Sequence, residues 1–203
     1  MYIYPSFSGS FVFSELLKLG DKLPYGKVRM SWAQVGSDTD PYQLGLVYTK
    51  SKFAYPGYTI GYISNGTIPN KDLKPTKTNS FEMGLELKFL KNRIGLDFTY
   101  YSQLSKNQIM GMASSSTSGY GYRLINAGEI ENKGVEIALN TRPIQTKDFS
   151  WDLNFNFSKN SNKVKKLVDD RDMFELEKAT WLDVQVAAKV GENFGSIVGL
   201  SLI

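Results

Sequence analysis

The strongest pattern along this chain is a strict alternation of apolar and polar residues. Between residues 93 and 102, for example, Ile94, Leu96 and Phe98 alternate with polar residues such as Asp97. Successive side chains of a β-strand point to opposite faces, so such a segment predicts a strand with one apolar and one polar face. The alternating segments are 7–13, 28–32, 81–89, 93–102, 135–140 and 149–158. The first of them would place Phe7, Phe11 and Phe13 on one face, and no helical period fits the last.

The connections between these segments alternate in length. Residues 90–92 and 143–148 make short polar links, whereas 36–79 and 107–131 are long connections that we interpret as loops. Short turns at one end and long loops at the other are typical of an outer-membrane β-barrel, with the turns periplasmic and the loops extracellular. A soluble β-sandwich also alternates apolar with polar residues, but such a clean division of loop lengths is not expected of it.

The composition of the apolar faces also favours a barrel. They are dominated by Phe, Trp, Leu and Met in runs that suit a lipid-facing band on strands of about 9–11 residues. The predicted fold is therefore all-β, a segment of an antiparallel transmembrane barrel. The side chains expected to face lipid are Phe81, Met83, Leu85, Leu87, Ile94, Leu96, Phe98, Val135, Ile137, Leu139, Trp151, Leu153, Phe155 and Phe157.

Composition narrows the chemistry. The sequence contains no cysteine and no histidine, which excludes a Ser-His-Asp triad, a Cys-His pair and any His-containing zinc site. The 24 Lys and Arg residues against 20 Asp and Glu give a net charge of +4. The basic residues are scattered along the chain except for Lys163, Lys165 and Lys166, which we assign to a solvated loop. No nucleic-acid partner is therefore expected. No apolar run reaches the roughly 20 residues of a spanning helix.

Carboxylate chemistry stays open on composition alone. Glu82, Glu86 and Glu136 could supply an acid/base pair for glycoside hydrolysis. On the predicted strands, however, they belong to the polar face, and lining a barrel interior is the favoured interpretation. A calcium loop starting near Asp38 is disfavoured because Tyr42 occupies its third ligand position. We therefore expect no catalytic, metal or cofactor site, and not an enzyme.

One loop carries a candidate ligand contact. Tyr120 and Tyr122 lie in a segment rich in serine and glycine. Tyrosine rings can stack on sugars, although aromatic loops are also common in barrels. Contact with a ligand and a purely structural role both stay open.

Several stretches of the sequence resemble conserved blocks of one protein family. Residues 27–36 (KVRMSWAQVG), followed by 38–42 (DTDPY), resemble a family block, and 80–86 and 92–101 resemble its paired strands. The most specific match is 125–136 (INAGEIENKGVE), similar to the signature N-A-G-x-I-x-N-x-G-V-E. Its matching positions include Asn126, Gly128, Asn132, Gly134 and Glu136. Residues 190–199 (VGENFGSIVG) resemble the block that follows. In these blocks the chain resembles the SusC/RagA-type TonB-linked outer-membrane proteins.

The resemblance implies a barrel of about 22 strands closed around a plug domain. Such proteins lie in the outer membrane among its lipids and import oligosaccharides or peptides. They draw energy from TonB and work with a SusD-like surface lipoprotein. Residues 1–203 are then expected to be an internal part of the later half of the barrel domain, without signal peptide, plug or closing strands. The alternative is a soluble carbohydrate-binding β-domain.

Overall fold

A computed structural model describes residues 3–20, 23–39, 44–45, 48–52, 56–63, 66–178 and 184–199. The chain divides into two compact units. The first, here called the sheet unit, contains Met1–Val35, Thr78–Leu104 and Glu131–Asn162. The second, here called the loop unit, contains Gly36–Lys77, Ser105–Ile130 and Lys163–Ile203.

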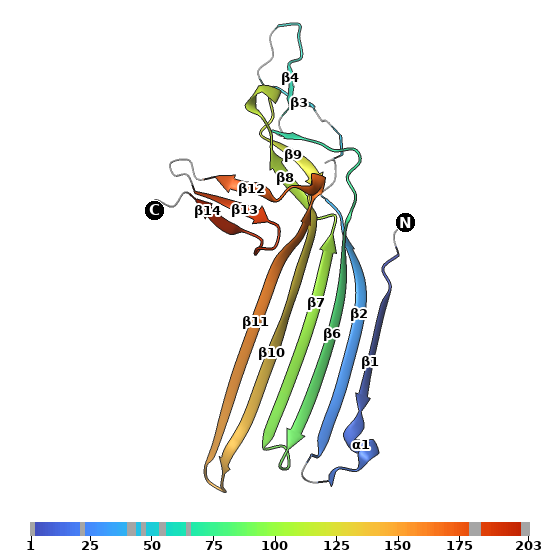
Figure 1. The fold of residues 1–203 in the computed structure, drawn as a ribbon, viewed down its shortest axis with the longest axis vertical. Coiled ribbons are helices and arrows are strands. Elements are labelled where there is room, and N and C mark those ends of the chain that lie inside the picture. The colour runs from blue at the N-terminus through green and yellow to red at the C-terminus, as the bar shows by residue number, and fades with distance from the viewer. Residues whose placement is uncertain are drawn as a thin grey trace. The chain divides into compact units, whose positions relative to one another are not determined.

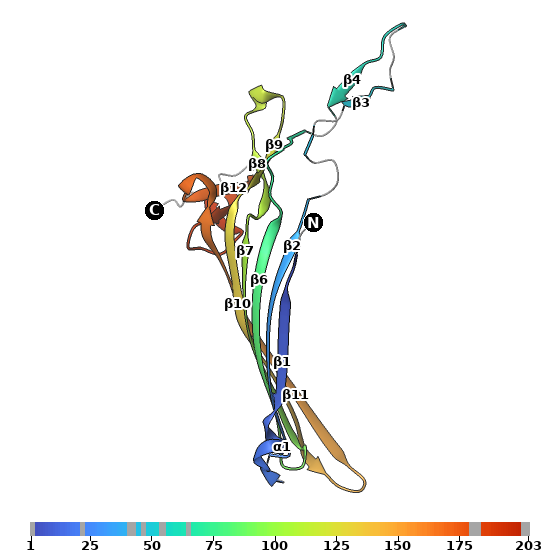
Figure 2. The ribbon, with the colours of Figure 1, turned by 90° about the vertical axis from the view of Figure 1, so that its right-hand side faces the viewer.

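Six long strands form the main sheet, in the order β1-β2-β6-β7-β10-β11, and lie side by side in Figure 1. They are β1 (Ser6–Val12), β2 (Tyr25–Ser37), β6 (Thr76–Phe89), β7 (Ile94–Lys106), β10 (Gly128–Gln145) and β11 (Ser150–Leu167). All six predicted strands are present and most are longer than the alternation indicated. Figure 2, turned by 90°, shows that the strands are twisted relative to one another, as expected for β-sheets.

The predicted short turns are confirmed. Between β6 and β7, the three residues Leu90, Lys91 and Asn92 have positive φ angles of 49°, 56° and 66°. Between β10 and β11, the amide of Thr146 donates to the carbonyl oxygen of Phe149 at 2.7 Å. Both turns lie at the same end of the sheet (Figure 1).

Phe13 does not continue the first strand, contrary to the prediction. It begins the short helix α1 (Phe13–Leu17), which ends at Lys18 in the left-handed region. The ring of Phe13 lies against Gly26 of β2, where an added Cβ would be 2.5 Å from the ring atom Cζ. At the end of β1, Phe13 therefore leaves the strand and packs its ring over a glycine.

The prediction of a loop over 107–131 is wrong, because most of this segment is β-structure. Its strands belong to a three-stranded sheet in which β8 and β9 are antiparallel and the two residues of β5 run parallel to β9. The strands within 36–77 and 105–127 have two to five residues and show no sustained alternation of apolar and polar side chains. They are β3 (Tyr48–Lys50), β4 (Gly61–Ile63), β5 (Thr67–Ile68), β8 (Ile109–Ala113) and β9 (Tyr122–Asn126), with the 3-10 helix η2 (Ser116–Ser118).

The assignment of Lys163, Lys165 and Lys166 to a loop is also wrong. They lie in β11, where they are exposed while the intervening Val164 is only 1% exposed. Lysine can hold such a strand position because its head group reaches water while the neighbouring residue enters a core. After β11 come η3 (Val168–Asp170) and a three-stranded sheet of β12 (Met173–Lys178), β13 (Val184–Lys189) and β14 (Ser196–Gly199).

The loop unit has a hydrophobic core of its own. Val164, Leu167, Phe174 and Ala188 form the buried cluster. Met112, Ile125, Val168 and Leu176 pack against it. Among the described residues, no helix combines the length and the apolar character needed to cross a membrane.

Candidate functional site

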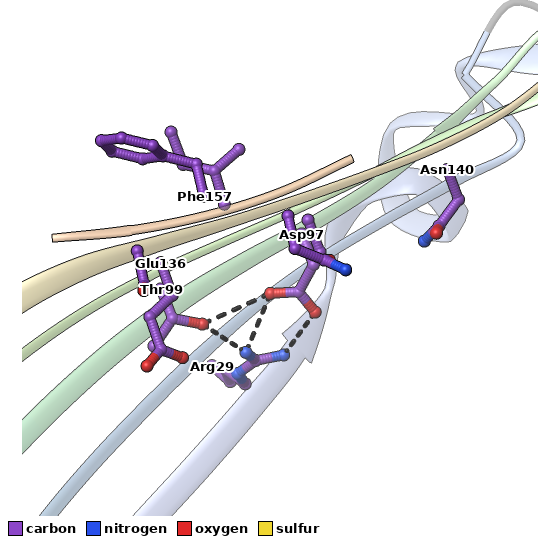
Figure 3. Close-up of a pocket in the computed structure, with 10 residues that line it drawn as sticks. Arg29, Asp97, Thr99, Glu136, Asn140 and Phe157 are labelled. Carbon is purple, nitrogen blue, oxygen red and sulfur yellow. Dashed lines mark hydrogen bonds and ion pairs between the residues drawn. The ribbon is translucent and has the colours of Figure 1, made fainter. Parts of the chain in front are cut away.

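A polar network crosses three neighbouring strands of the sheet unit. Arg29 of β2 donates from Nη1 to Asp97 Oδ2 at 3.1 Å and from Nη2 to Asp97 Oδ1 at 3.0 Å. Nη2 also donates to the hydroxyl of Thr99 at 2.6 Å, and Thr99 is 8% exposed. Figure 3 shows these contacts as dashed lines. A planar guanidinium that bonds both oxygens of a carboxylate fixes orientation as well as charge.

Gly84 of β6 makes this reach possible. The strand order places β6 between β2 and β7, so the Arg29 side chain has to pass over it. A Cβ at Gly84 would collide with the Cγ, Nε and Cζ atoms of Arg29. The absence of a side chain at Gly84 therefore opens the path of an interstrand strut, which we call the arginine strut (Arg29, Gly84, Asp97 and Thr99).

A second strut repeats the arrangement farther along the sheet. Tyr101 of β7 donates its hydroxyl to Asn160 Oδ1 of β11 at 3.2 Å, across the intervening β10. A Cβ at Gly134 of β10 would lie 2.6 Å from the Tyr101 hydroxyl oxygen and 2.5 Å from the carbonyl oxygen of Lys159. We call Tyr101, Gly134 and Asn160 the tyrosine strut. It gives the signature glycine at 134 a physical role.

The two struts fix which side chains share a face. They place Arg29, Gly84, Asp97, Tyr101, Gly134 and Asn160 on the polar face. Alternation along each strand then puts the apolar residues on the opposite face. On β1 the register agrees, because Phe7 pairs with Trp32 and their rings stack 6.0 Å apart.

The residues that the sequence predicted to face lipid all lie on this opposite, apolar face by the same alternation. Several are strongly exposed in the structure, with 59% for Phe155, 47% for Trp151 and 40% for Met83. Leu153 and Phe157 are also exposed, at 44% each, and the others are half-buried. An apolar face of this extent that no other described part of the sheet unit covers is unusual for a protein in water.

The three glutamates considered for catalysis all lie on the polar face, but no single cavity is lined by all three. Glu136 lines a cavity of about 500 Å³ on the polar face together with Arg29, Asp97 and Asn156 (Figure 3). Glu82 lines a separate cavity, and Glu86 pairs with Lys88 at 3.7 Å. Within the described parts of the chain, no three Asp or Glu residues are placed to hold a metal ion.

The signature residue Asn126 joins three segments of the loop unit. Its Oδ1 accepts from the Lys74 amide at 2.8 Å, and its Nδ2 donates to the carbonyl oxygens of Lys74 at 2.7 Å and Asn107 at 3.0 Å. An amide side chain is suited to this position because it carries both a donor and an acceptor. Asn126 therefore provides hydrogen-bond partners for backbone groups of two connections, the one before β6 and the one between β7 and β8.

Gly128 occupies a position that only glycine fits. Its φ is 153°, and an added Cβ would collide with the carbonyl oxygen of Lys166 and lie 3.0 Å from Leu167 Cα. The backbones are also hydrogen-bonded next to this position, since the Val168 amide donates to the carbonyl oxygen of Ala127 at 2.8 Å. Gly128 thus permits β10 to approach β11 where both enter the loop unit.

The remaining candidate residues, Asn132, Tyr120 and Tyr122, make fewer side-chain hydrogen bonds. Asn132 Oδ1 is buried and has no hydrogen-bond partner among the described residues. Tyr122 is 50% exposed at the start of β9, and the Tyr120 amide donates to Ser118 Oγ at 3.3 Å. The struts were missed at the sequence level, because alternation gives the face of each residue but not the strand order that brings Arg29 to Asp97.

A twisted antiparallel sheet with one exposed apolar face and one hydrogen-bonded polar face is the architecture of a β-barrel wall. Residues 4–195 match the family model described as TonB dependent receptor-like, beta-barrel. The chain belongs to this family, which confirms the all-β barrel fold predicted from the sequence and its likeness to the SusC/RagA type.

Individual relatives support the same family assignment. The chain is 31% identical to TonB-dependent receptor P3 of Formosa agariphila over 90% of its own length and 19% of that protein. It is 31% identical to TonB-dependent receptor SusC of Bacteroides thetaiotaomicron over 73% of its length and 16% of that protein. The structure of the RagAB peptide transporter superposes with a TM-score of 0.79 at 21% identity, over 93% of this chain and 20% of that one. The chain thus spans about a fifth of the relatives it matches.

Proposed function

We propose that this chain forms part of the barrel wall of an outer-membrane, TonB-dependent importer. The apolar face contacts lipid and the polar face, with its two struts, lines the barrel interior. The short turns after β6 and β10 then lie at the periplasmic end, and the loop unit is built from the extracellular connections. This is a role in transport and not in catalysis.

The observation that carries the proposal is the uncovered apolar face. Phe7 is 71% exposed, Phe155 59% and Trp151 47%, and every one of them lies on the face opposite the struts. In water such a face would be strongly unfavourable at roughly 25 cal/mol per Å² of apolar surface. In a bilayer the same face is matched to its surroundings, which supports a lipid-facing role for the apolar residues of β6, β7, β10 and β11.

The open edges of the sheet support a larger barrel. β1 and β11 are the outer strands of the six-stranded order within the described residues. Unpaired strand edges are excluded from the hydrocarbon region because each unsatisfied backbone group costs several kcal/mol there. We infer that both edges pair with further strands of the complete receptor.

The family and its relatives support a set of partners. SusC is among the relatives, and the RagAB structures share the fold, so we propose a SusD-like surface lipoprotein as partner and TonB as the energy source. The proposed cargo is an oligosaccharide or a peptide. Exposed Tyr122 and the adjacent Tyr120 are proposed ligand contacts, because they lie in the extracellular connections of this arrangement.

A test of the wall uses adjacent positions with opposite orientation. The 203 residues contain no cysteine. In a full-length receptor whose other cysteines, where present, are replaced by serine, a single cysteine is introduced at Phe155 or at Asn156. Each is labelled with an environment-sensitive fluorophore after reconstitution into vesicles. We expect brominated lipid to quench the label at 155 and aqueous iodide to quench the label at 156.

The same pair at Leu85 and Glu86 repeats the measurement on a second strand. The opposite quenching pattern on both strands, or iodide quenching at all four positions, would contradict a lipid-facing apolar face. Recovery of the full-length protein in the soluble fraction without detergent would instead favour a soluble carbohydrate-binding domain.

A further inference from the structure

A cationic cavity in the loop unit is not explained by the barrel wall. Its volume is about 380 Å³, and its lining includes Pro69, Asn70, Lys71, Asp72 and Arg123. These residues come from the connection before β6 and from strand β9, and a third segment contributes Leu44 and Gly45 to the lining. All of them belong to the loop unit, whereas the residues of both struts belong to the sheet unit.

The two cationic side chains of this cavity are exposed and are not neutralised internally. No ion pair or hydrogen bond within the described part of the chain engages the side chains of Lys71 or Arg123. Elsewhere Arg29 and Arg142 are paired with Asp97 and Asp152 at 3.0 and 2.6 Å. The cavity therefore presents a guanidinium and an ammonium whose donors are free, next to the single carboxylate of Asp72.

Two of the three segments that line the cavity are held in place by backbone contacts. Arg123 lies within β9 and pairs with Ile68 of β5 on one side and Met112 of β8 on the other. At the start of the facing segment, the carbonyl oxygen of Gly66 accepts from the amides of Gly121 at 2.7 Å and Tyr122 at 3.1 Å.

The far end of that segment and its turn are also fixed. Lys74 is held by both polar atoms of the Asn126 side chain. Between the two ends, Asn70 Oδ1 accepts from the Asp72 amide at 3.0 Å, and its carbonyl oxygen accepts from the Leu73 amide at 3.2 Å. A site that is ordered before its ligand arrives loses less entropy on binding.

From these observations we propose that the cavity is a binding subsite for a singly charged acidic group, a carboxylate, of the solute that the receptor captures. This inference rests on the proposed importer function. The Arg123 fork and the Lys71 ammonium donate to the carboxylate oxygens, since hydrogen bonds between charged groups are the strong ones. Asp72 disfavours a dianion through like-charge repulsion, which makes the subsite selective among anions. The role of Asn126 is then to position the lysine-bearing segment.

The experiment compares matched acidic and neutral solutes on the purified full-length receptor in detergent. One pair is tetragalacturonate and the neutral tetragalactoside of the same linkage. The other pair is a capped tetrapeptide with one glutamate and its glutamine counterpart. Calorimetric titration should give at least about tenfold tighter binding for the acidic member of one pair, consistent with a charge-assisted hydrogen bond. The pair that shows the preference identifies the source of the carboxylate.

Variants then assign the preference to this cavity. Lys71→Gln and Arg123→Gln should each reduce the preference several-fold, and the double variant should remove it, because the acidic member loses more affinity than the neutral member. Arg123→Lys retains the charge without the fork and should keep part of the preference. Lys147→Gln, an exposed lysine in the β10–β11 turn, is the matched control and should have no effect.

Two results would overturn the subsite: equal affinity for both members of both pairs, or an acid preference that survives in the double variant. Uptake of the bound solute by energised cells separates this inference from the importer proposal. Uptake without an acid preference overturns only the subsite, whereas an acid preference that depends on Arg123 and Lys71 without any TonB-dependent uptake overturns only the importer.

Discussion

The sheet unit and the loop unit place their apolar side chains in opposite ways. Every hydrophobic residue that is buried in the described part of the chain belongs to the loop unit, including Val164 at 1% and Phe174 at 5% exposure. The sheet unit instead exposes large side chains, with Phe7 at 71% and Phe155 at 59%. One unit supplies its own apolar environment, and the other needs an external one.

The two units also differ in what fixes their backbone. In the sheet unit the same arrangement repeats from strand to strand, with ladder hydrogen bonds and long side chains that cross a glycine. In the loop unit the fold depends on single residues such as Asn126 and Gly128, each in contact with several segments. The sheet should therefore tolerate most single changes that respect its faces, and the loop unit should be sensitive at a few positions.

The largest expected effect is that of Gly128→Val. The valine Cβ collides with the carbonyl oxygen of Lys166, and the φ of 153° is strained for any residue with a side chain. Strain and overpacking together should destabilise the loop unit by about 4 kcal/mol or more. Limited proteolysis of the full-length receptor in detergent should reveal cleavage within 105–130 and 163–178 that the unchanged receptor resists.

Gly9→Val is the matched control, because an added Cβ at Gly9 meets nothing within 4 Å. It should leave the proteolytic pattern unchanged. If both variants behaved alike, the close approach of β10 and β11 at Gly128 would not be the feature that holds the loop unit.

The next largest effect separates the faces of the sheet. Phe155→Arg should destabilise the reconstituted receptor by about 2–4 kcal/mol, the cost of a lipid-facing arginine near the bilayer midplane. Asn156→Arg places the same charge on the polar face, beside the cavity of about 500 Å³, and should cost far less. Urea unfolding in lipid vesicles measures both. Equal destabilisation would remove the difference between the two faces.

The sheet unit can be predicted from the sequence to a greater extent than the loop unit, and the reason is physical. Alternation is a property of one strand, so the six strands, their faces and the turn at 90–92 follow from the sequence. It fails where local packing takes over, as at Phe13, whose ring packs over Gly26. It is also silent on segments as short as β5, whose two residues are too few for a period.

The candidate sites divide in the same way. The resemblance identified Asn126, Gly128 and Gly134 as positions of interest, but only the three-dimensional structure assigns them hydrogen bonds and close approaches. The arginine strut needed the strand order, and the cationic cavity needed the parallel pairing of β5 with β9. Contacts between segments distant in the sequence were not accessible to single-strand patterns.

A smaller effect is expected where the arginine strut is cut. Arg29→Met removes the donors to Asp97 and Thr99 and should destabilise the receptor by about 1–2 kcal/mol, since the ion pair is roughly one-third exposed and hence partly screened. Arg142→Met is the matched control, because its pair with Asp152 has side chains 45% and 50% exposed. It should cost less than about 1 kcal/mol. A greater loss for Arg142→Met than for Arg29→Met in urea unfolding would contradict the special role of the strut.

The smallest effect concerns the tyrosine strut and tests whether the sheet is stiffened across strands. Tyr101→Phe removes one hydroxyl and its hydrogen bond to Asn160, at an expected cost of about 0.5–1.5 kcal/mol. Because the effect is small, a double-mutant cycle with Asn160→Ala is the suitable measurement. If the bond couples β7 to β11 across β10, the double variant should be less destabilised than the sum of the two single variants. Strict additivity would mean that each strand is held by its immediate neighbours alone, and that Gly134 serves only to make room for the Tyr101 ring.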